Sequence, residues 1–211
     1  AKAMASQGPL QWDVARQTAM MTALSGNSSE PNVDPAARVG IEQLVPIADL
    51  HVRNHTGLDT ASVGKDPHVV VVNRSLWVHH TLESYKPLFT ELAQSLSATS
   101  ATYSTEIDSL HDDPMANMMA SLNKMMAPAM MGMSVGTMVG QLALRTFGQY
   151  DLPLPREPRD QVLIVVANVD EFASDWSLAT NDMRMWVLIH ELTSHAVLTS
   201  PHIREALSAA L

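Results

Sequence analysis

Two short runs of apolar residues, at positions 69–72 and 161–168, interrupt a chain whose remaining patterning is helical. Runs rich in β-branched residues with no helical period are typical of buried strands. Asp34 and Pro35 resemble an N-cap followed by proline at the first helical position, so a helix is predicted from there to about residue 55, bent near Pro46. Other helices are predicted over residues 10–24, 76–97 (capped by Ser75), 114–148, 170–176 and 183–199 and from residue 201, with a loop at 95–104.

Long helices around two isolated strands predict a mostly helical α+β fold. Residues 1–211 are expected to form a single domain, and the 46% of apolar residues can supply its core. We expect no nucleic-acid partner, because 22 acidic residues outweigh 13 Lys and Arg, which form no basic cluster. The chain has no cysteine, which excludes disulfides and thiolate metal sites and is consistent with a cytoplasmic location.

Residues 125–144 contain no charged side chain and are numerous enough to cross a bilayer. Gly132, Gly136 and Gly140 are four residues apart and so share one helix face. In a membrane this spacing would indicate close helix packing, whereas in a water-soluble domain the glycines would admit a neighbouring helix. Polar residues such as Gln141 favour the second interpretation, with no membrane partner, and the many methionines of the region are expected to fill the core.

The segment from Trp186 to Val197 carries the strongest chemical signal, His190-Glu191-Leu192-Thr193-Ser194-His195. It resembles the zincin motif His-Glu-x-x-His, in which two histidines one helical turn apart bind one Zn²⁺. The glutamate beside the first histidine accepts a proton from the water at the metal. We therefore predict Glu191 as the general base and His190 and His195 as zinc ligands.

The spacing departs from that motif by one residue. His190 and His195 are five residues apart, which is about 140° around a regular helix, so both reach one ion only if the helix is distorted. A π-bulge near Ser194 would restore the register. Otherwise Ser194 takes the second ligand position and binds zinc weakly. A third interpretation is a buried His-Glu pair in an ordinary core, without metal.

Most of the chain, and not only the motif, is similar to the zincin-like hydrolases associated by name with deazaflavin-coenzyme biosynthesis. The residues that carry the resemblance are Trp12-Asp13, His51-Val52, Thr56-Gly57-Leu58, the run from Val70 to Val78, the run from Leu144 to Leu154, the run from Val165 to Val169, the run from Trp186 to Glu191, Pro201 and Arg204. The run from Leu144 to Leu154, which includes Gly148-Gln149-Tyr150-Asp151, is the most distinctive of them.

The resemblance implies a zincin-like domain with a long buried helix and few strands. It also implies a zinc-dependent hydrolase or metallopeptidase acting on a peptide or small molecule. Members of the family are longer, so C-terminal elements that would supply a third ligand are expected beyond Leu211; within the chain His202 is the nearest candidate for that ligand. The alternative is an inactive zincin-like scaffold or binding module with a degenerate metal site.

Overall fold

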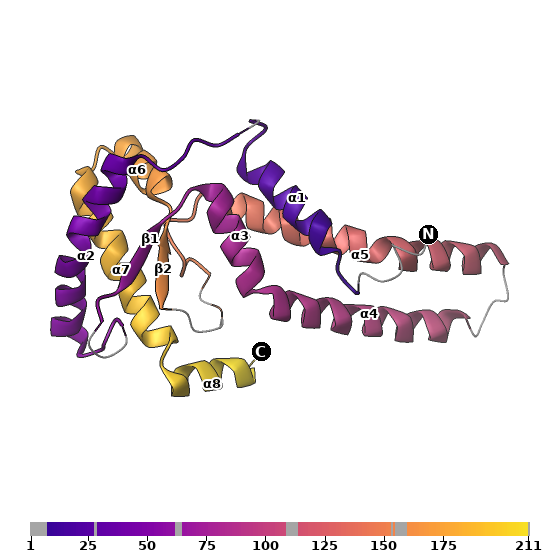
Figure 1. Cartoon of the computed structure of the whole chain (residues 1–211). Coiled ribbons are helices and arrows are strands. Elements are labelled where there is room, and N and C mark those ends of the chain that lie inside the picture. Colours follow the sequence, from indigo (N-terminus) through magenta and orange to yellow (C-terminus); the bar gives the residue numbers. More distant parts are fainter. Residues whose placement is uncertain are drawn as a thin grey trace. The chain divides into compact units, whose positions relative to one another are not determined.

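The computed structural model of the protein describes residues 8–27, 29–61, 65–108, 114–152, 154 and 160–210 (Figure 1). In this part of the chain the fold is mostly helical with few strands, which confirms the predicted class. The elements are α1 Trp12–Ala23, α2 Pro35–Thr56, β1 His68–Val71, α3 Arg74–Ser84, α4 Lys86–Asp108, α5 Pro114–Ala143, β2 Gln161–Ile164, α6 Val166–Asp175, α7 Thr180–Leu198 and α8 Pro201–Ala210.

The chain divides into two compact units, each built from two separate segments. One unit comprises Ala1–Asn27 and Val78–Leu142, and therefore carries α1, α4 and nearly all of α5. The other comprises Ser28–Trp77 and Ala143–Leu211, and carries both strands with α2, α6, α7 and α8. The motif segment on α7 therefore lies in the unit that contains the sheet.

The two strands pair in parallel, with His68 opposite Gln161 and Val71 opposite Ile164. Apolar residues of α2, β1, β2, α6 and α7 form one buried cluster around them. The predicted second strand was too long, because Val166 and Asn168 belong to α6. A short apolar run does not distinguish a buried strand from a buried helix, and here Val166 and Val169 contribute to the same core at helical spacing.

Local signals set the start of α2 as predicted. The Asp34 carboxylate accepts a hydrogen bond from the Ala36 N–H at 3.0 Å, and Pro35 occupies the first turn. The predicted cap of the next helix was wrong. Ser75 lies inside α3, and Asn73 Oδ1 accepts the Leu76 N–H instead, at 3.0 Å.

The predicted loop at residues 95–104 was also wrong, since α4 continues to Asp108. Serine and threonine are poor helix formers because their hydroxyls compete for backbone groups. In α4 the Ser97 hydroxyl donates to the Ala93 carbonyl at 2.7 Å, one turn earlier, so its hydrogen bond is made within the helix. The sequence pattern predicted a single helix over residues 76–97. The structure has two helices there, because α3 ends at Ser84 and α4 begins at Lys86.

The glycines of α5 admit a neighbouring helix, as predicted, and that helix is α1. A methyl group on Gly132 would lie 2.6 Å from the Gln11 carbonyl oxygen, and one on Gly140 would lie 2.7 Å from the Ala19 carbonyl oxygen. Any residue with a Cβ would therefore push α1 away from α5. The Gln11 N–H also donates to the Pro128 carbonyl at 3.0 Å, at the proline inside α5.

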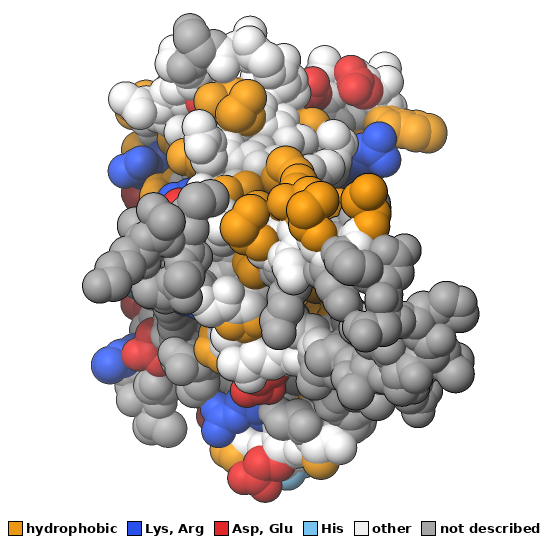
Figure 2. Space-filling model, turned by 90° about the vertical axis from the view of Figure 1, so that its right-hand side faces the viewer, with side chains coloured by type: hydrophobic (Ala, Val, Ile, Leu, Met, Phe, Trp, Pro, Cys, Tyr) orange, Lys and Arg blue, Asp and Glu red, His pale blue; other side chains and the backbone are white. Residues whose placement is uncertain are grey.

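The expectation that the methionines of α5 fill the core was wrong for most of those that the structure describes. Val135, Val139 and Ala143 are the buried side of this helix, and its methionines lie largely on the outside. Figure 2 shows hydrophobic side chains gathered on the face that it draws. Within the described residues, no helix is long and apolar enough to cross a membrane. The exposed methionines, at 43–65% of full exposure, are Met115, Met118, Met125, Met126, Met130, Met133 and Met138.

Candidate metal centre

Helix α7 carries the motif and is α-helical without interruption from Thr180 to Leu198. No π-turn occurs at Ser194, so the helix does not adopt the bulge that would restore the zincin spacing. Val187, Leu188 and Leu192 face the core that α7 shares with α2, α6 and β2. On this regular helix Glu191 falls on the buried side and His190 on the exposed side.

Glu191 is completely buried, and a backbone loop binds its carboxylate. The N–H groups of Gln149 and Tyr150 donate to Oε2 at 2.8 and 2.9 Å. Two charge-assisted hydrogen bonds favour the ionised carboxylate and offset part of the cost of removing it from water. Gly148 makes this approach possible, because a Cβ there would lie 2.7 Å from Oε2.

The same loop brings a second carboxylate to α7. Asp151 follows Tyr150, and its Oδ2 accepts hydrogen bonds from the Phe147 N–H at 2.6 Å and the Thr146 hydroxyl at 2.5 Å. These contacts close the loop into a tight turn. Asp151, His190 and Glu191 each offer one ligand atom, and these atoms lie within 4.8 Å of one another. No other His, Asp or Glu side chains in the described part of the chain form such a group of three.

The His190 ring is exposed and stacks on the Trp186 indole one turn earlier, with ring centroids 5.5 Å apart and planes 9° apart. This contact fixes the plane of the imidazole beside Glu191. Stacked aromatic rings gain about 0.5–1.5 kcal/mol beyond the area that they bury.

His195 is not a member of the three-residue group. It is buried, and its Nδ1 lies 2.7 Å from the Tyr150 hydroxyl. The residue five positions after His190 points about 140° away on a regular helix, which explains the separation. Ser194 is half-buried on α7, and His202 lies exposed on α8 with its Nδ1 2.9 Å from the Ser200 hydroxyl.

The structure thus brings the predicted His190 and Glu191 together and adds Asp151, which the sequence analysis did not select. Asp151 lies in the distinctive stretch from Leu144 to Leu154, so a signal was present. The spacing of the motif residues does not indicate which other part of the chain lies beside them. Asp151 comes close to His190 only because the loop folds onto α7.

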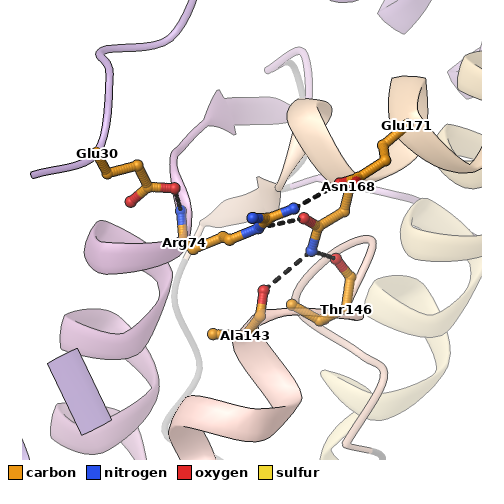
Figure 3. A network of polar contacts seen from close by, with 6 residues as sticks. All are labelled: Glu30, Arg74, Ala143, Thr146, Asn168 and Glu171. Carbon is orange, nitrogen blue, oxygen red and sulfur yellow. Dashed lines mark hydrogen bonds and ion pairs between the residues drawn. The ribbon is translucent and has the colours of Figure 1, made fainter. Parts of the chain in front are cut away.

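A polar network holds the segment that leads into this loop (Figure 3). The Asn168 amide on α6 donates to the Ala143 and Thr146 carbonyls at 3.0 and 2.6 Å, and its oxygen accepts from Arg74 Nε at 2.6 Å. Arg74 also pairs with Glu171 at 2.6 Å. The end of α5 and the start of the site loop are therefore fastened to α6.

A second ion pair fastens α6 to α7. Arg184 Nε and Nη2 donate to the two Asp170 carboxylate oxygens at 2.8 and 2.5 Å. These hydrogen bonds raise the pKa of the Arg184 guanidinium above its ordinary value. A group whose pKa is raised by folding stabilises the fold at every pH below its unfolded pKa. This stabilisation is lost only as the pH rises through the folded pKa. Near neutral pH Arg184 is therefore charged and its ion pair with Asp170 is intact.

The donor set fits a zinc-type ion. Zinc in proteins takes histidine nitrogen and carboxylate oxygen, and His190 and Asp151 offer one of each beside the carboxylate of Glu191. Two carboxylates with a neutral imidazole also balance the charge of a divalent ion. Ligands in a tetrahedral site with bonds of about 2.1 Å lie about 3.4 Å apart. The three ligand atoms lie within 4.8 Å of one another, a limit that is wider than that spacing.

A pocket of about 570 Å³ lies elsewhere in the same unit, at the starts of α2, α3 and α6. Its lining includes Arg74, Arg184 and Asp170 but none of the three residues of the candidate metal centre. The Glu30 carboxylate closes one side by accepting the Arg74 and Ser75 N–H groups at 2.9 and 2.8 Å.

Comparisons with known proteins identify the family of the chain and a similar fold. Residues 10–211 match the sequence profile of the zincin-like metallopeptidases. No curated protein matches the sequence. The fold is similar to the crystal structure of a putative hydrolase with a novel fold from Chloroflexus aurantiacus, with a TM-score of 0.65 and 18% identity. The match covers 95% of this chain and 57% of that one, so the chain spans little more than half of that relative's length.

Proposed function

This chain belongs to the family of zincin-like metallopeptidases, and from that premise we propose that it is a zinc-dependent hydrolase acting on peptide bonds. One observation carries the proposal. Asp151 from the loop after α5 and His190 and Glu191 from α7 place three ligand atoms within 4.8 Å of one another. Two carboxylates this close repel each other unless a positive charge compensates them, and a divalent cation would supply that charge.

In this proposal His190 and Asp151, both exposed, hold the metal on the side that a substrate can reach. A zinc ion supplies Lewis acidity there, lowering the pKa of water and polarising the scissile carbonyl. Glu191 acts as the general base, accepting a proton from water and returning it to the leaving amine. The Gln149 and Tyr150 N–H groups orient its carboxylate during both transfers.

His195, expected as a ligand from the motif, has a different part in the proposal. Its contact with the Tyr150 hydroxyl fastens the site loop to α7 at a second point. The Glu191 carboxylate holds the same loop by accepting hydrogen bonds from the loop's backbone N–H groups. Asp151 takes the ligand position that the displaced histidine leaves open.

Elemental analysis of the purified full chain after zinc loading and dialysis tests the proposal. We expect about one zinc per chain in the wild type, and its loss in His190→Ala and in Asp151→Asn. His68→Ala is the control, because His68 is an exposed histidine of the same unit outside the group. Glu191→Gln should keep the zinc and abolish peptide hydrolysis. A wild type without zinc, or equal zinc content in all variants, would refute the metal centre.

A binding module without catalysis is the second candidate, and the 570 Å³ pocket at the starts of α2, α3 and α6 favours it. Two arginines and three carboxylates line that pocket, so it suits a polar ligand with charges of both signs; they are Arg74, Arg184, Glu30, Asp34 and Asp170. Three results together would support this function over the first. The wild type would hold no zinc and show no hydrolysis. Added free amino acids would raise its melting temperature, and Arg74→Ala would abolish that rise.

A further inference from the structure

Trp186 is a large apolar side chain left exposed beside the candidate metal centre. It keeps 56% of its full exposure, although the core-facing positions of α7 lie immediately next to it at Val187 and Leu188. An indole in water forgoes the free energy of burial, about 25 cal/mol for each Å² of apolar surface. Its exposed surface is therefore available for a contact outside the core.

The stack with His190 accounts for one face of the indole only. The two planes are 9° apart with centroids at 5.5 Å, so the imidazole covers one face. The face opposite His190, here called the open face, takes no part in this stack, and the residue as a whole is 56% exposed. Along α7 the order is open indole face, indole, imidazole, and then the group formed with Asp151 and Glu191. A flat apolar surface therefore adjoins a ligand of the centre.

We propose that Trp186 is the specificity-determining residue of the centre, and that its open face binds an apolar or aromatic side chain of a peptide substrate. This inference rests on the proposed function and adds its substrate class. An extended peptide advances about 3.3–3.6 Å per residue. A side chain stacked on the open face lies about 3.5–4.0 Å beyond the indole. Because the indole itself is 5.5 Å from the His190 ring, the bound side chain lies about three residues of extended peptide from the centre.

Peptide binding gives a direct test that does not depend on turnover. The probes are acetyl-Ala-Ala-Phe-Ala-Ala-amide and its analogue with serine in place of phenylalanine, titrated into the zinc-loaded full chain by calorimetry. We expect the phenylalanine peptide to bind about 10-fold more tightly, since stacking of one aromatic side chain together with its apolar burial is worth about that factor. Trp186→Ala should reduce this ratio to near 1, and Trp186→Phe should keep most of it.

Trp176→Ala is the matched control. Trp176 is 68% exposed in the same unit and also stacks on an aromatic ring, Phe172, with centroids 5.8 Å apart, but it lies on the loop after α6. The control should leave the preference for phenylalanine unchanged. A ratio that Trp186→Ala leaves unchanged, or that Trp176→Ala reduces equally, would overturn the proposal.

The same samples separate this proposal from the proposed function. Zinc content is measured on each protein, and the titrations are repeated after removal of zinc with a chelator. Loss of the metal centre appears as missing zinc, whereas loss of the apolar platform appears as a phenylalanine-to-serine ratio near 1 in the wild type. Circular dichroism of Trp186→Ala should match the wild type, because the side chain is outside the core.

Discussion

Gly148→Ala tests whether the contact between the site loop and Glu191 organises the centre. A Cβ at position 148 would lie 2.7 Å from Glu191 Oε2 and 2.8 Å from Cγ, closer than side chains pack. The backbone of Gly148 is not in the left-handed region, so the effect comes from space and not from conformational strain.

The size of the effect follows from what the methyl group displaces. Overpacking of a buried site costs about 1–3 kcal/mol. Loss of hydrogen bonds to a buried carboxylate costs about 1.5–3 kcal/mol more, because the charge stays out of water. We expect Gly148→Ala to lower the free energy of unfolding of the α7-bearing unit by about 3–5 kcal/mol.

The assay combines urea unfolding with hydrogen exchange of the Gln149 and Tyr150 amides, which should lose protection first. Gly40→Ala is the control. A Cβ there meets no backbone atom but lies 2.8 Å from Arg184 Nη1, the guanidinium nitrogen outside the two hydrogen bonds to Asp170, so the expected cost is about 1 kcal/mol. In a Glu191→Ala background the penalty of Gly148→Ala should largely disappear, since the clashing atoms are gone. An undiminished penalty there, or wild-type stability of Gly148→Ala, would refute the reasoning.

Three further outcomes follow from single contacts. Tyr150→Phe removes the hydroxyl beside His195 and should lower the free energy of unfolding, measured in urea, by about 1 kcal/mol. Its zinc content should stay unchanged, and loss of zinc would contradict the ligand set. Asn168→Ala removes hydrogen bonds to two backbone carbonyls and should cost about 2–4 kcal/mol, with faster hydrogen exchange over residues 143–151 as the local sign. Gly136→Ala, whose Cβ would lie 2.8 Å from Thr18 Cβ, should cost about 1–3 kcal/mol; limited proteolysis would show α1 released, and an uncleaved α1 would count against the packing.

Local chemistry was sufficient for some elements and insufficient for others. Asp34 and Pro35 begin α2 as predicted, because an N-cap and a first-turn proline act within a few residues. The end of β2 and the whole of α4 beyond residue 95 were predicted wrongly. In those segments the propensities are weak, and packing against other elements decides the conformation.

The sequence by itself determined the helical class and the family, and it selected His190 and Glu191 as candidate site residues. Each of these depends on residues that are near one another in the sequence, such as an apolar periodicity or two adjacent residues. Tertiary structure alone decided that Asp151 joins them and that His195 faces Tyr150 instead. The physical reason is the regular geometry of α7, which turns position 195 about 140° away from position 190, and the space at Gly148, which lets a distant loop close on Glu191.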